Sequence, residues 1–306
     1  MPNYPVIYFV YKRTKNIKIF LDIMFKAGVK KIYIFGDGPK NEEEKIHTDK
    51  VRELIADYQS KNGEVEIQAS LFTYNKGLKI NIIDGLNNVF KIEQAGIIIE
   101  DDCLPNKDFF RFANEVLDKY KHDTKIMSIN GTSLGGKFKH SYDFTKYPQC
   151  WGWATWARAW KLYDPNLSYL TQASWDIELK YLNLGTIVRW YWHTLYLMIG
   201  SGQIKTWDYQ WSFAHFFNHG LSIVPSVNLI KNTGFDNYAT NTKIKNNVAN
   251  LKTQNVTWPL IHPTNICENS LISHQIERHF YSSPIAIFGL LRQYFYWRLG
   301  IYANRN

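Results

Sequence analysis

Short apolar runs alternate with longer amphipathic segments over the first 130 residues of the chain. The runs are rich in Ile, Val, Phe and Tyr and predict buried strands, while apolar residues at every third or fourth position between them predict helices. The predicted strands are residues 4–11, 31–35, 65–71, 97–99 and 125–129, and the predicted helices are residues 16–27, 41–60 and 78–90. Because strands and helices alternate, we expect a parallel, doubly wound sheet flanked by helices.

After residue 130 the pattern becomes mixed. Residues 131–147 are polar and predict a loop, which leads into a tryptophan-rich segment. The expected elements after it are helices at 186–199 and 208–218 and short strands at 221–224 and 227–230. The sequence therefore predicts a nucleotide-binding part at 1–130, a mixed α/β part of the same domain at 131–265, and C-terminal helices at 266–306.

The last predicted helix, at residues 284–303, is both aromatic and basic. Its apolar residues are interleaved with Arg292 and Arg298 and include Phe288, Leu291, Phe295, Trp297 and Ile301. A helix of this kind can lie in a membrane interface. Packing against the rest of the domain is the alternative.

Composition narrows the class of partner. A chain of 306 residues with 45% hydrophobic and 21% charged residues is globular and can bury a large core. Its net charge of +9 favours an anionic partner such as a nucleotide diphosphate or an acidic membrane face. No basic block is present, so nucleic acid is disfavoured. The 11 Trp and 20 Tyr residues suit stacking on bases or sugars, and core packing is the alternative.

Cysteine usage and the apolar segments indicate a cytoplasmic protein. The three cysteines, Cys103, Cys150 and Cys267, are far apart, which argues against disulfides and a zinc site. The basic residues near the N-terminus follow the apolar run, which is the wrong order for a signal peptide. No stretch is long and apolar enough to span a membrane. Peripheral attachment to the inner face of the membrane would come from residues 284–303.

Three acids follow the most apolar predicted strand. Glu100, Asp101 and Asp102 come directly after three consecutive Ile residues. Carboxylates this close repel one another and resist burial, so we expect a cation to compensate them. In open α/β sheets, ligands bind outside the carboxyl ends of the strands. Oxygen ligands suit Mn²⁺ or Mg²⁺ bridging a carboxylate and a substrate diphosphate. The alternative is a solvated acidic turn before a helix that starts near Asn106.

Other residues can serve the same chemistry. Lys12, Arg13 and Lys79 can contact phosphate oxygens. Asp208 is a candidate general base, because aromatic neighbours would desolvate it and raise its pKa, and a helix N-cap is the alternative role. Direct displacement with a single carboxylate base implies inversion at the anomeric carbon.

Two further motifs have competing interpretations. Trp151, Trp153 and Trp156 surround Gly152 and predict a platform for sugars, with a hydrophobic hinge between the two halves as the alternative. His215 and His219 stand four apart on a predicted helix, but the Glu of a metalloprotease motif is missing, which favours structural roles.

The polar segment at 232–252 is rich in Asn and Thr. Its first part, 232–242, includes Gly234 and Asp236 and is expected to order over a donor, or else to form a surface loop.

The strand followed by Glu-Asp-Asp-x-x-Pro and Asp-Phe-Phe resembles the DxD-type motif of GT-A-fold glycosyltransferases. The likeness is to the N-acetylglucosaminyltransferase I type and to bacterial glycosyltransferase-like proteins with a Trp-Gly-Trp-Ala-Thr-Trp segment. It covers residues 4–235 in element order and implies a GT-A-like, Rossmann-like fold. It also implies a nucleotide-sugar donor, with UDP favoured, and Mn²⁺ or Mg²⁺ as the cofactor.

The resemblance also assigns roles to individual residues. Asp102 would bind the metal, and Glu100 and Asp101 would face the donor sugar and the ribose. Arg13 and Asp37 match positions that hold the nucleotide. Lys79, six residues before Gly85, matches a nucleotide contact that is often His in the family. Asp208 follows Trp207 as the catalytic base follows Trp in the family, although the next residue is Tyr209 instead of a second Asp.

The sequence thus favours a metal-dependent, inverting glycosyltransferase that acts on a glycan or lipid-linked acceptor in surface-polysaccharide synthesis. The alternative enzyme is a sugar nucleotidylyltransferase. That class carries a Gly-rich loop after its first strand, whereas residues 11–15 here read Tyr-Lys-Arg-Thr-Lys. A non-catalytic carbohydrate-binding protein on the same fold is the third possibility.

Overall fold

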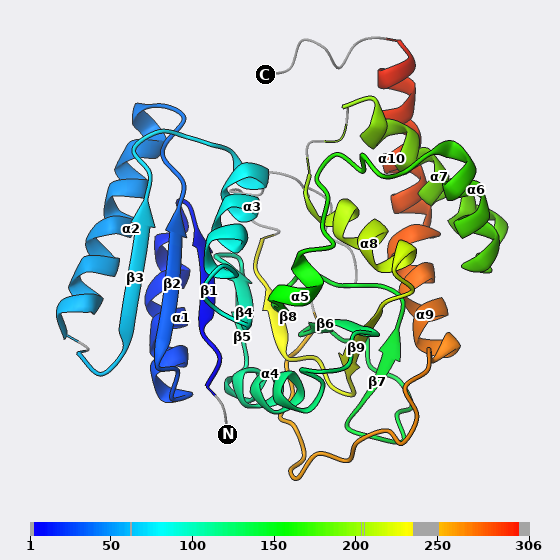
Figure 1. Ribbon diagram of the computed structural model, residues 1–306. Coiled ribbons are helices and arrows are strands. Elements are labelled where there is room, and N and C mark those ends of the chain that lie inside the picture. Colours follow the sequence, from blue (N-terminus) through cyan, green and yellow to red (C-terminus); the bar gives the residue numbers. More distant parts are fainter. Residues whose placement is uncertain (1–2, 62, 203, 205, 235–250, 300–306) are drawn as a thin grey trace.

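A large sheet flanked by helices forms the body of the molecule (Figure 1). The computed structural model describes residues 3–61, 63–202, 204, 206–234 and 251–299. The sheet has eight strands in the order β3-β2-β1-β4-β8-β6-β9-β7, and β5 and β10 form a separate two-stranded sheet. The α/β class and the mostly parallel, Rossmann-like sheet are confirmed.

The first part of the chain follows the predicted alternation closely. Its elements are β1 (Val6–Val10), α1 (Thr14–Lys26), β2 (Lys31–Gly36), α2 (Glu42–Lys61), β3 (Glu66–Leu71), α3 (Leu78–Val89) and β4 (Ala95–Glu100). The pairs β3–β2, β2–β1 and β1–β4 are all parallel. Because β1 and β4 are neighbours and run the same way, the residues that follow both strands emerge at one edge of the sheet.

The second part contains more elements than the sequence predicted. They are β5 (Cys103–Pro105), α4 (Lys107–Lys119), β6 (Ile126–Asn130), β7 (Tyr142–Thr145), β8 (Trp153–Trp156), α5 (Ala157–Trp160), α6 (Gln172–Tyr181), α7 (Thr186–Gly200), α8 (Asp208–Phe217), β9 (Leu221–Pro225), β10 (Ile230–Asn232), α9 (Ser270–Ile276), the π-helix η2 (Glu277–Tyr281) and α10 (Pro284–Arg298). The helix expected near Asn106 is confirmed, and the Asn106 side chain accepts a hydrogen bond from the Asp108 amide.

Two predictions for this part are wrong. The loop expected at 131–147 contains β7, which pairs antiparallel with β9 and buries Tyr142 and Phe144 while Asp143 is partly exposed. The segment is polar overall, but burial of these two aromatic residues at alternate positions accounts for the edge strand. The short strand expected at 227–230 lies instead at Ile230–Asn232, where it pairs with β5.

The tryptophan-rich segment supplies a strand in the middle of the sheet. β6 joins the sheet as expected, but β8 lies between β4 and β6 and runs antiparallel to both. Trp153 pairs with Ile98. As a result, the residues just before Trp153 emerge at the same edge of the sheet as Glu100, Asp101 and Asp102.

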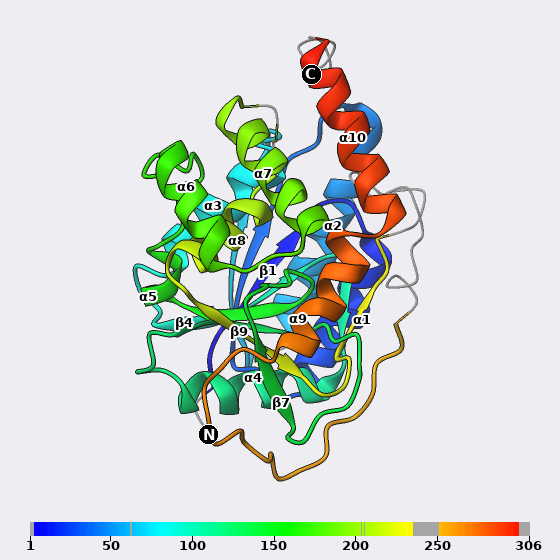
Figure 2. The same cartoon turned by 90° about the vertical axis from the view of Figure 1, so that its right-hand side faces the viewer.

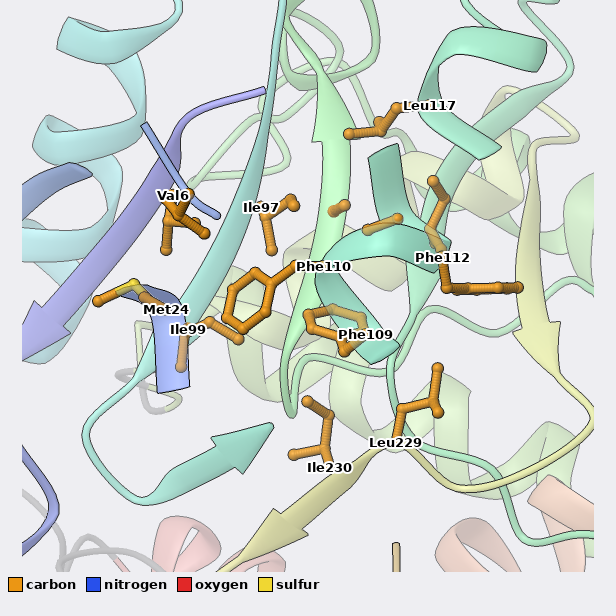
Figure 3. Packing of buried hydrophobic residues seen from close by; sticks show 14 of the residues in the cluster. Val6, Met24, Ile97, Ile99, Phe109, Phe110, Phe112, Leu117, Leu229 and Ile230 are labelled. Carbon is orange, nitrogen blue, oxygen red and sulfur yellow. The ribbon is translucent and has the colours of Figure 1, made fainter. Parts of the chain in front are cut away.

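Helices cover both faces of the sheet. On one face, α1, α2 and α4 pack against the strands, and Figure 3 shows Phe109 and Phe110 of α4 beside Ile97 and Ile99 of β4. On the other face, α3, α5 and α8 gather around Trp153. A third cluster joins α6, α7, α9, η2 and α10. Strands from both predicted parts share one sheet, and the boundaries at 130 and 265 stay predictions.

His215 is buried within this core, whereas His219 lies half-exposed at the end of α8. The neutral His215 ring donates from Nδ1 to the Trp211 carbonyl (3.0 Å) and accepts at Nε2 from Ser128 Oγ (3.0 Å). Burial lowers the pKa of His215 to about 3. The two histidines therefore do not converge on one point, and His215 has a structural role.

The buried histidine predicts acid destabilisation. Between its unfolded pKa near 6.5 and the folded value of about 3, only the unfolded chain binds the proton, so stability falls as pH falls. His215→Gln should be less stable than the parent at pH 7.5 by about 1–3 kcal/mol. It should also lose less stability from pH 6.5 to 5, where the histidine contributes up to about 1.4 kcal/mol per pH unit.

Urea unfolding at several pH values measures both effects. His122→Gln, at an exposed position, is the matched control and should keep the parent's pH dependence. Parallel pH profiles for the His215→Gln protein and the parent would show that His215 does not titrate in this way.

Candidate active site

The three acids lie at the carboxyl edge of the sheet, beside the end of β1. Glu100 is the last residue of β4, and Asp101 follows it. Asp101 Oδ2 accepts a hydrogen bond from the Tyr11 amide at 2.9 Å, and Asp101 Oδ1 lies 3.4 Å from Arg13 Nε. Parallel pairing of β1 and β4 therefore brings the predicted phosphate-binding arginine and the acidic motif together.

Asp102 is held by residues from a distant part of the chain. Its carbonyl oxygen accepts hydrogen bonds from the Thr233 amide (2.7 Å) and Thr233 Oγ1 (2.9 Å). Gly234 packs so closely on the Asp102 carboxylate that an added Cβ would clash with it. The Cys103 thiol donates to Asp102 Oδ1 at 3.2 Å. The start of segment 232–242, which was expected to order over a donor, is thus anchored at the acids. Residues 235–242 of this segment lie outside the described residues.

Asp208 reaches the carboxyl edge of the sheet from the face that α8 covers, opposite to α4. It is the first residue of α8, and the preceding Trp207 stacks on Trp153 with 5.6 Å between ring centroids and 24° between planes. The N-cap position belongs to Trp207, so the alternative capping role of Asp208 is not supported. Asp208 is only partly exposed, and burial raises its pKa.

The charges of these carboxylates affect one another's pKa values. Burial raises the pKa of Glu100 well above its ordinary value, and the charges of Asp102, Asp101 and Asp208 raise it further, in that order. Burial and the Asp102 charge raise the pKa of Asp101 to about 7, although Arg13 opposes the shift. Ionisation of all these carboxylates together is therefore unfavourable, and a bound cation would favour their charged forms.

The residues present fit a hard divalent cation shared with a ligand. No group of three His, Cys, Asp or Glu side chains converges as a complete metal site within the part of the chain that the structure describes. Mg²⁺ and similar ions are commonly held by one or two carboxylates together with substrate phosphates. The Asp102 carboxylate, which also accepts a hydrogen bond from the Cys103 thiol, has oxygens of this kind, and the Asp101 carboxylate contacts Tyr11 and Arg13.

The Asp37 carboxylate is engaged by its own backbone neighbour and by the loop before α3, and its nucleotide-binding role stays a prediction. Its carboxylate accepts hydrogen bonds from the amides of Gly38 (2.9 Å), Lys76 (2.7 Å) and Gly77 (3.0 Å) and from Asn75 Nδ2 (3.1 Å). A carboxylate offers about four lone-pair sites, so its acceptor capacity is already used. Asp37 fastens the loop between β3 and α3.

Lys79 and Lys12 lie near the carboxyl edge of the sheet, and each contacts another residue of the protein. Lys79 Nζ approaches the Pro165 carbonyl at 3.4 Å, and burial lowers the pKa of its ammonium. Gln210 of α8 approaches the same carbonyl at 3.4 Å. Lys12 Nζ pairs with Glu44 Oε1 at 2.8 Å. Lys79 thus faces the side of the site where α8 lies.

The tryptophan-rich motif divides between core and surface. Trp153 is 1% exposed and lies against Trp160, Trp207 and Trp211, so it cannot offer a ring face to a sugar. Trp156 is also buried. For these two rings the alternative hydrophobic-packing interpretation is correct.

Gly152 also serves packing. It has φ +61°, and an added Cβ would clash with Ile230. Its lack of a side chain therefore lets the Ile230 side chain pack against the backbone of the motif.

Trp151 is the ring of the motif that stays partly exposed. It meets Phe280 of η2 edge to face, with ring centroids 5.9 Å apart. The adjacent Tyr281 and the preceding Cys150 both lie close enough to Asp208 that its charge raises their pKa values, after the larger effect of burial. Phe280 and Tyr281 had no recognisable sequence signal, because they reach the site only through tertiary packing of the C-terminal helices.

Comparisons with known proteins were limited. No family model matches the chain, and no curated protein matches it. Among solved structures, a 4-diphosphocytidyl-2C-methyl-D-erythritol synthase from Anaerococcus prevotii shares 10% identity, with 55% of this chain and 78% of that chain covered and a TM-score of 0.35. A UDP-glucose pyrophosphorylase complexed with UDP-glucose shares 9% identity, with 73% and 90% covered and a TM-score of 0.41.

Both neighbours are nucleotidyl-transferring enzymes, the class of the alternative hypothesis, and neither is a glycosyltransferase. The resemblance to the N-acetylglucosaminyltransferase I type finds no support among these comparisons. At such low identity and TM-score, the two likenesses carry no inference about activity.

Asp37→Ala tests the scaffold role of this carboxylate. The change leaves buried amide donors without their charged acceptor, so unfolding free energy should drop by about 2–3 kcal/mol. Asp84→Asn on α3 is the matched control, because it removes only the half-exposed carboxylate that pairs with Lys76 of this loop and should cost less than about 1 kcal/mol. Denaturant unfolding compares them. Unchanged stability with weaker nucleotide binding would establish the ligand-binding role of Asp37 instead.

Proposed function

We propose that this protein is a metal-dependent, inverting glycosyltransferase. It moves a sugar from a nucleotide diphosphate donor, with UDP favoured, to a hydroxyl of a glycan or lipid-linked acceptor in surface-polysaccharide synthesis. The observation that carries the proposal is the arrangement of Glu100, Asp101 and Asp102 at the carboxyl edge, with Asp208 close enough to raise the pKa of Glu100. The end of the site at Asp102 is suited to a cation and a diphosphate, and the end at Asp208 presents a single carboxylate.

The donor side is built to hold negative charge. Asp102 would hold Mn²⁺ or Mg²⁺ together with the donor diphosphate, and the ion would supply Lewis-acid stabilisation of the leaving group. Asp101 pairs with Arg13 at this edge, and the guanidinium would contact phosphate oxygens of the donor. Lys79 adds a second cation on the side of α8. Glu100 is placed to accept hydrogen bonds from the donor sugar.

The acceptor side needs a group that removes a proton. A sugar hydroxyl is a weak nucleophile, and a positioned carboxylate contributes about 10²–10⁴-fold by general-base catalysis. Asp208 sits at the start of α8 in partly buried, aromatic surroundings that raise its pKa toward the range useful for a base. Trp151 and Phe280 offer apolar ring edges and faces beside it for a sugar.

A sugar nucleotidylyltransferase is the second candidate. Its nucleophile is a sugar phosphate that is already ionised, so that reaction has no need of Asp208 as a base. The structural neighbours have names from this class. The two functions differ in product: the glycosyltransferase releases a nucleoside diphosphate, whereas the nucleotidylyltransferase releases pyrophosphate from a nucleoside triphosphate and a sugar phosphate.

Asp102→Ala tests the donor side. Calorimetry with UDP should show binding to the parent protein that depends on Mn²⁺, because the ion joins the carboxylate to the diphosphate, and the variant should lose it. Asp118→Asn, on the exposed side of α4, is the control and should bind as the parent does. Mn²⁺-dependent binding that survives in the variant removes Asp102 from the metal site.

Asp208→Asn tests the base and the reaction class together. The variant should bind the donor normally but turn over at least about a hundredfold more slowly, because it cannot accept the hydroxyl proton. Release of UDP from UDP-sugars measures turnover, and Asp176→Asn on α6 is the exposed control. Near-normal turnover would exclude Asp208 as the base. Pyrophosphate release from UTP and a sugar phosphate would establish the second candidate instead.

A further inference from the structure

α10 is apolar on every side, yet the protein covers only part of it. Its sequence, PIAIFGLLRQYFYWR, buries Leu290 fully and packs Ala286, Tyr294 and Trp297 against the helical cluster of α7 and η2. A helix that is apolar all round is normally buried. Figures 1 and 2 show that α10 lies at the outside of the molecule and that its end extends past the neighbouring helices. The uncovered side of α10 therefore lacks a partner within the described chain.

The uncovered side forms a continuous stripe of large apolar residues. Phe288 is 68% exposed and Phe295 is 63% exposed. The other members follow the same helical spacing and are Ile285, Leu291 and Leu299. Single exposed apolar residues are ordinary, but a row of five along one helix indicates an interaction surface. We call these five residues the α10 stripe.

The charges beside the stripe are all positive. No Asp or Glu follows Glu277 in the sequence, and Glu277 itself is buried, where it accepts a hydrogen bond from the Tyr147 hydroxyl. Arg278, Arg292 and Arg298 are exposed around the stripe.

The neighbouring helix α7 has the same character, although it lies about a hundred residues away in sequence. No acid occurs between Glu178 and Asp208. α7 exposes Ile187 and Trp190 next to Arg189. Two distant segments that both lack acids thus meet at this corner of the molecule.

We propose that the α10 stripe, with the arginines beside it, docks onto an anionic lipid membrane. Aromatic and aliphatic side chains suit the boundary between headgroups and acyl chains, and arginines at its rim suit acidic headgroups. No helix in the described ranges is long and apolar enough to cross a bilayer. In the proposed docking, α10 would lie along the membrane surface. A two-fold contact between two copies would bring two positively charged rims together with no acid of the stripe region to pair with them, which disfavours a dimer.

The docking helix follows directly on a segment that contacts residues of the candidate active site. η2 immediately precedes α10, and its Phe280 and Tyr281 lie at Trp151 and near Asp208. Membrane docking itself does not rest on the proposed function. If that function holds, the arrangement brings the acceptor side toward lipid and favours a lipid-linked acceptor.

The test is co-sedimentation of the full chain with vesicles, without donor or metal. Vesicles of phosphatidylcholine with phosphatidylglycerol should bind the protein, and vesicles of phosphatidylcholine alone should bind it more weakly. Phe288→Ser with Phe295→Ser should weaken binding at least about tenfold, since two large apolar side chains no longer insert. Arg292→Gln should cost about fivefold on the anionic vesicles, the equivalent of about 1 kcal/mol per surface arginine, and little on the neutral ones.

Matched controls lie on α1, where Phe25 and Lys26 are exposed but Asp22 is close by. Phe25→Ser and Lys26→Gln should bind like the parent, and unchanged melting temperatures should show that all variants are folded. The proposal is overturned if the parent does not bind anionic vesicles or if the stripe variants bind as the parent does. It is also overturned if the α1 variants lose as much vesicle binding as the stripe variants. Concentration-dependent dimerisation abolished by Phe288→Ser, without vesicle binding, would identify a second copy as the partner and also overturn it.

Discussion

The antiparallel pairing of β8 with β4 is the constraint from which the site follows. It places the residues before Trp153 beside the acids that follow Ile98. Trp153 in turn stacks on Trp207, and that contact fixes where α8 begins. Asp208 is the first residue of α8, so one strand pairing and one ring contact bring it within electrostatic reach of Glu100. The tryptophan-rich motif thus acts as the core that joins the donor and acceptor sides.

Crowded negative charge is the second feature of this edge. Glu100, Asp101 and Asp208 all have raised pKa values because burial weakens their hydration, and for Glu100 and Asp101 neighbouring carboxylates add to the effect. Asp101 is partly compensated by Arg13 and by the Tyr11 amide. In the proposed function, Asp101 would orient the arginine and the Asp102 carboxylate would supply oxygens to a cation. A fold that keeps such a charge imbalance is suited to binding positive charge together with an anionic ligand.

Local sequence signals predicted the first half of the fold and the place of the acids, because most strands there are continuous apolar runs followed by a helix. The exception is the edge strand β3, which was expected to be buried but is largely exposed and carries Glu66, Gln68 and Ser70. Local signals could not show that β8 enters antiparallel between β4 and β6, which depends on pairing between distant segments. Nor could they separate the buried Trp153 from the partly exposed Trp151, since both have the same composition signal. The loop contacts of Asp37 could not be predicted either, because its partners at Asn75 to Gly77 arrive some forty positions later.

The account depends on one bridging interaction, in which a divalent ion joins the Asp102 carboxylate to the donor diphosphate while Asp208 faces the opposite side. A crystal structure with Mn²⁺ and an unreactive UDP-sugar tests it most directly. The account predicts Mn²⁺ about 2.0–2.3 Å from oxygens of both Asp102 and the diphosphate, with Asp208 across the sugar from the nucleotide. Nucleotide bound elsewhere, or bound at this edge without an ion at Asp102, would contradict it.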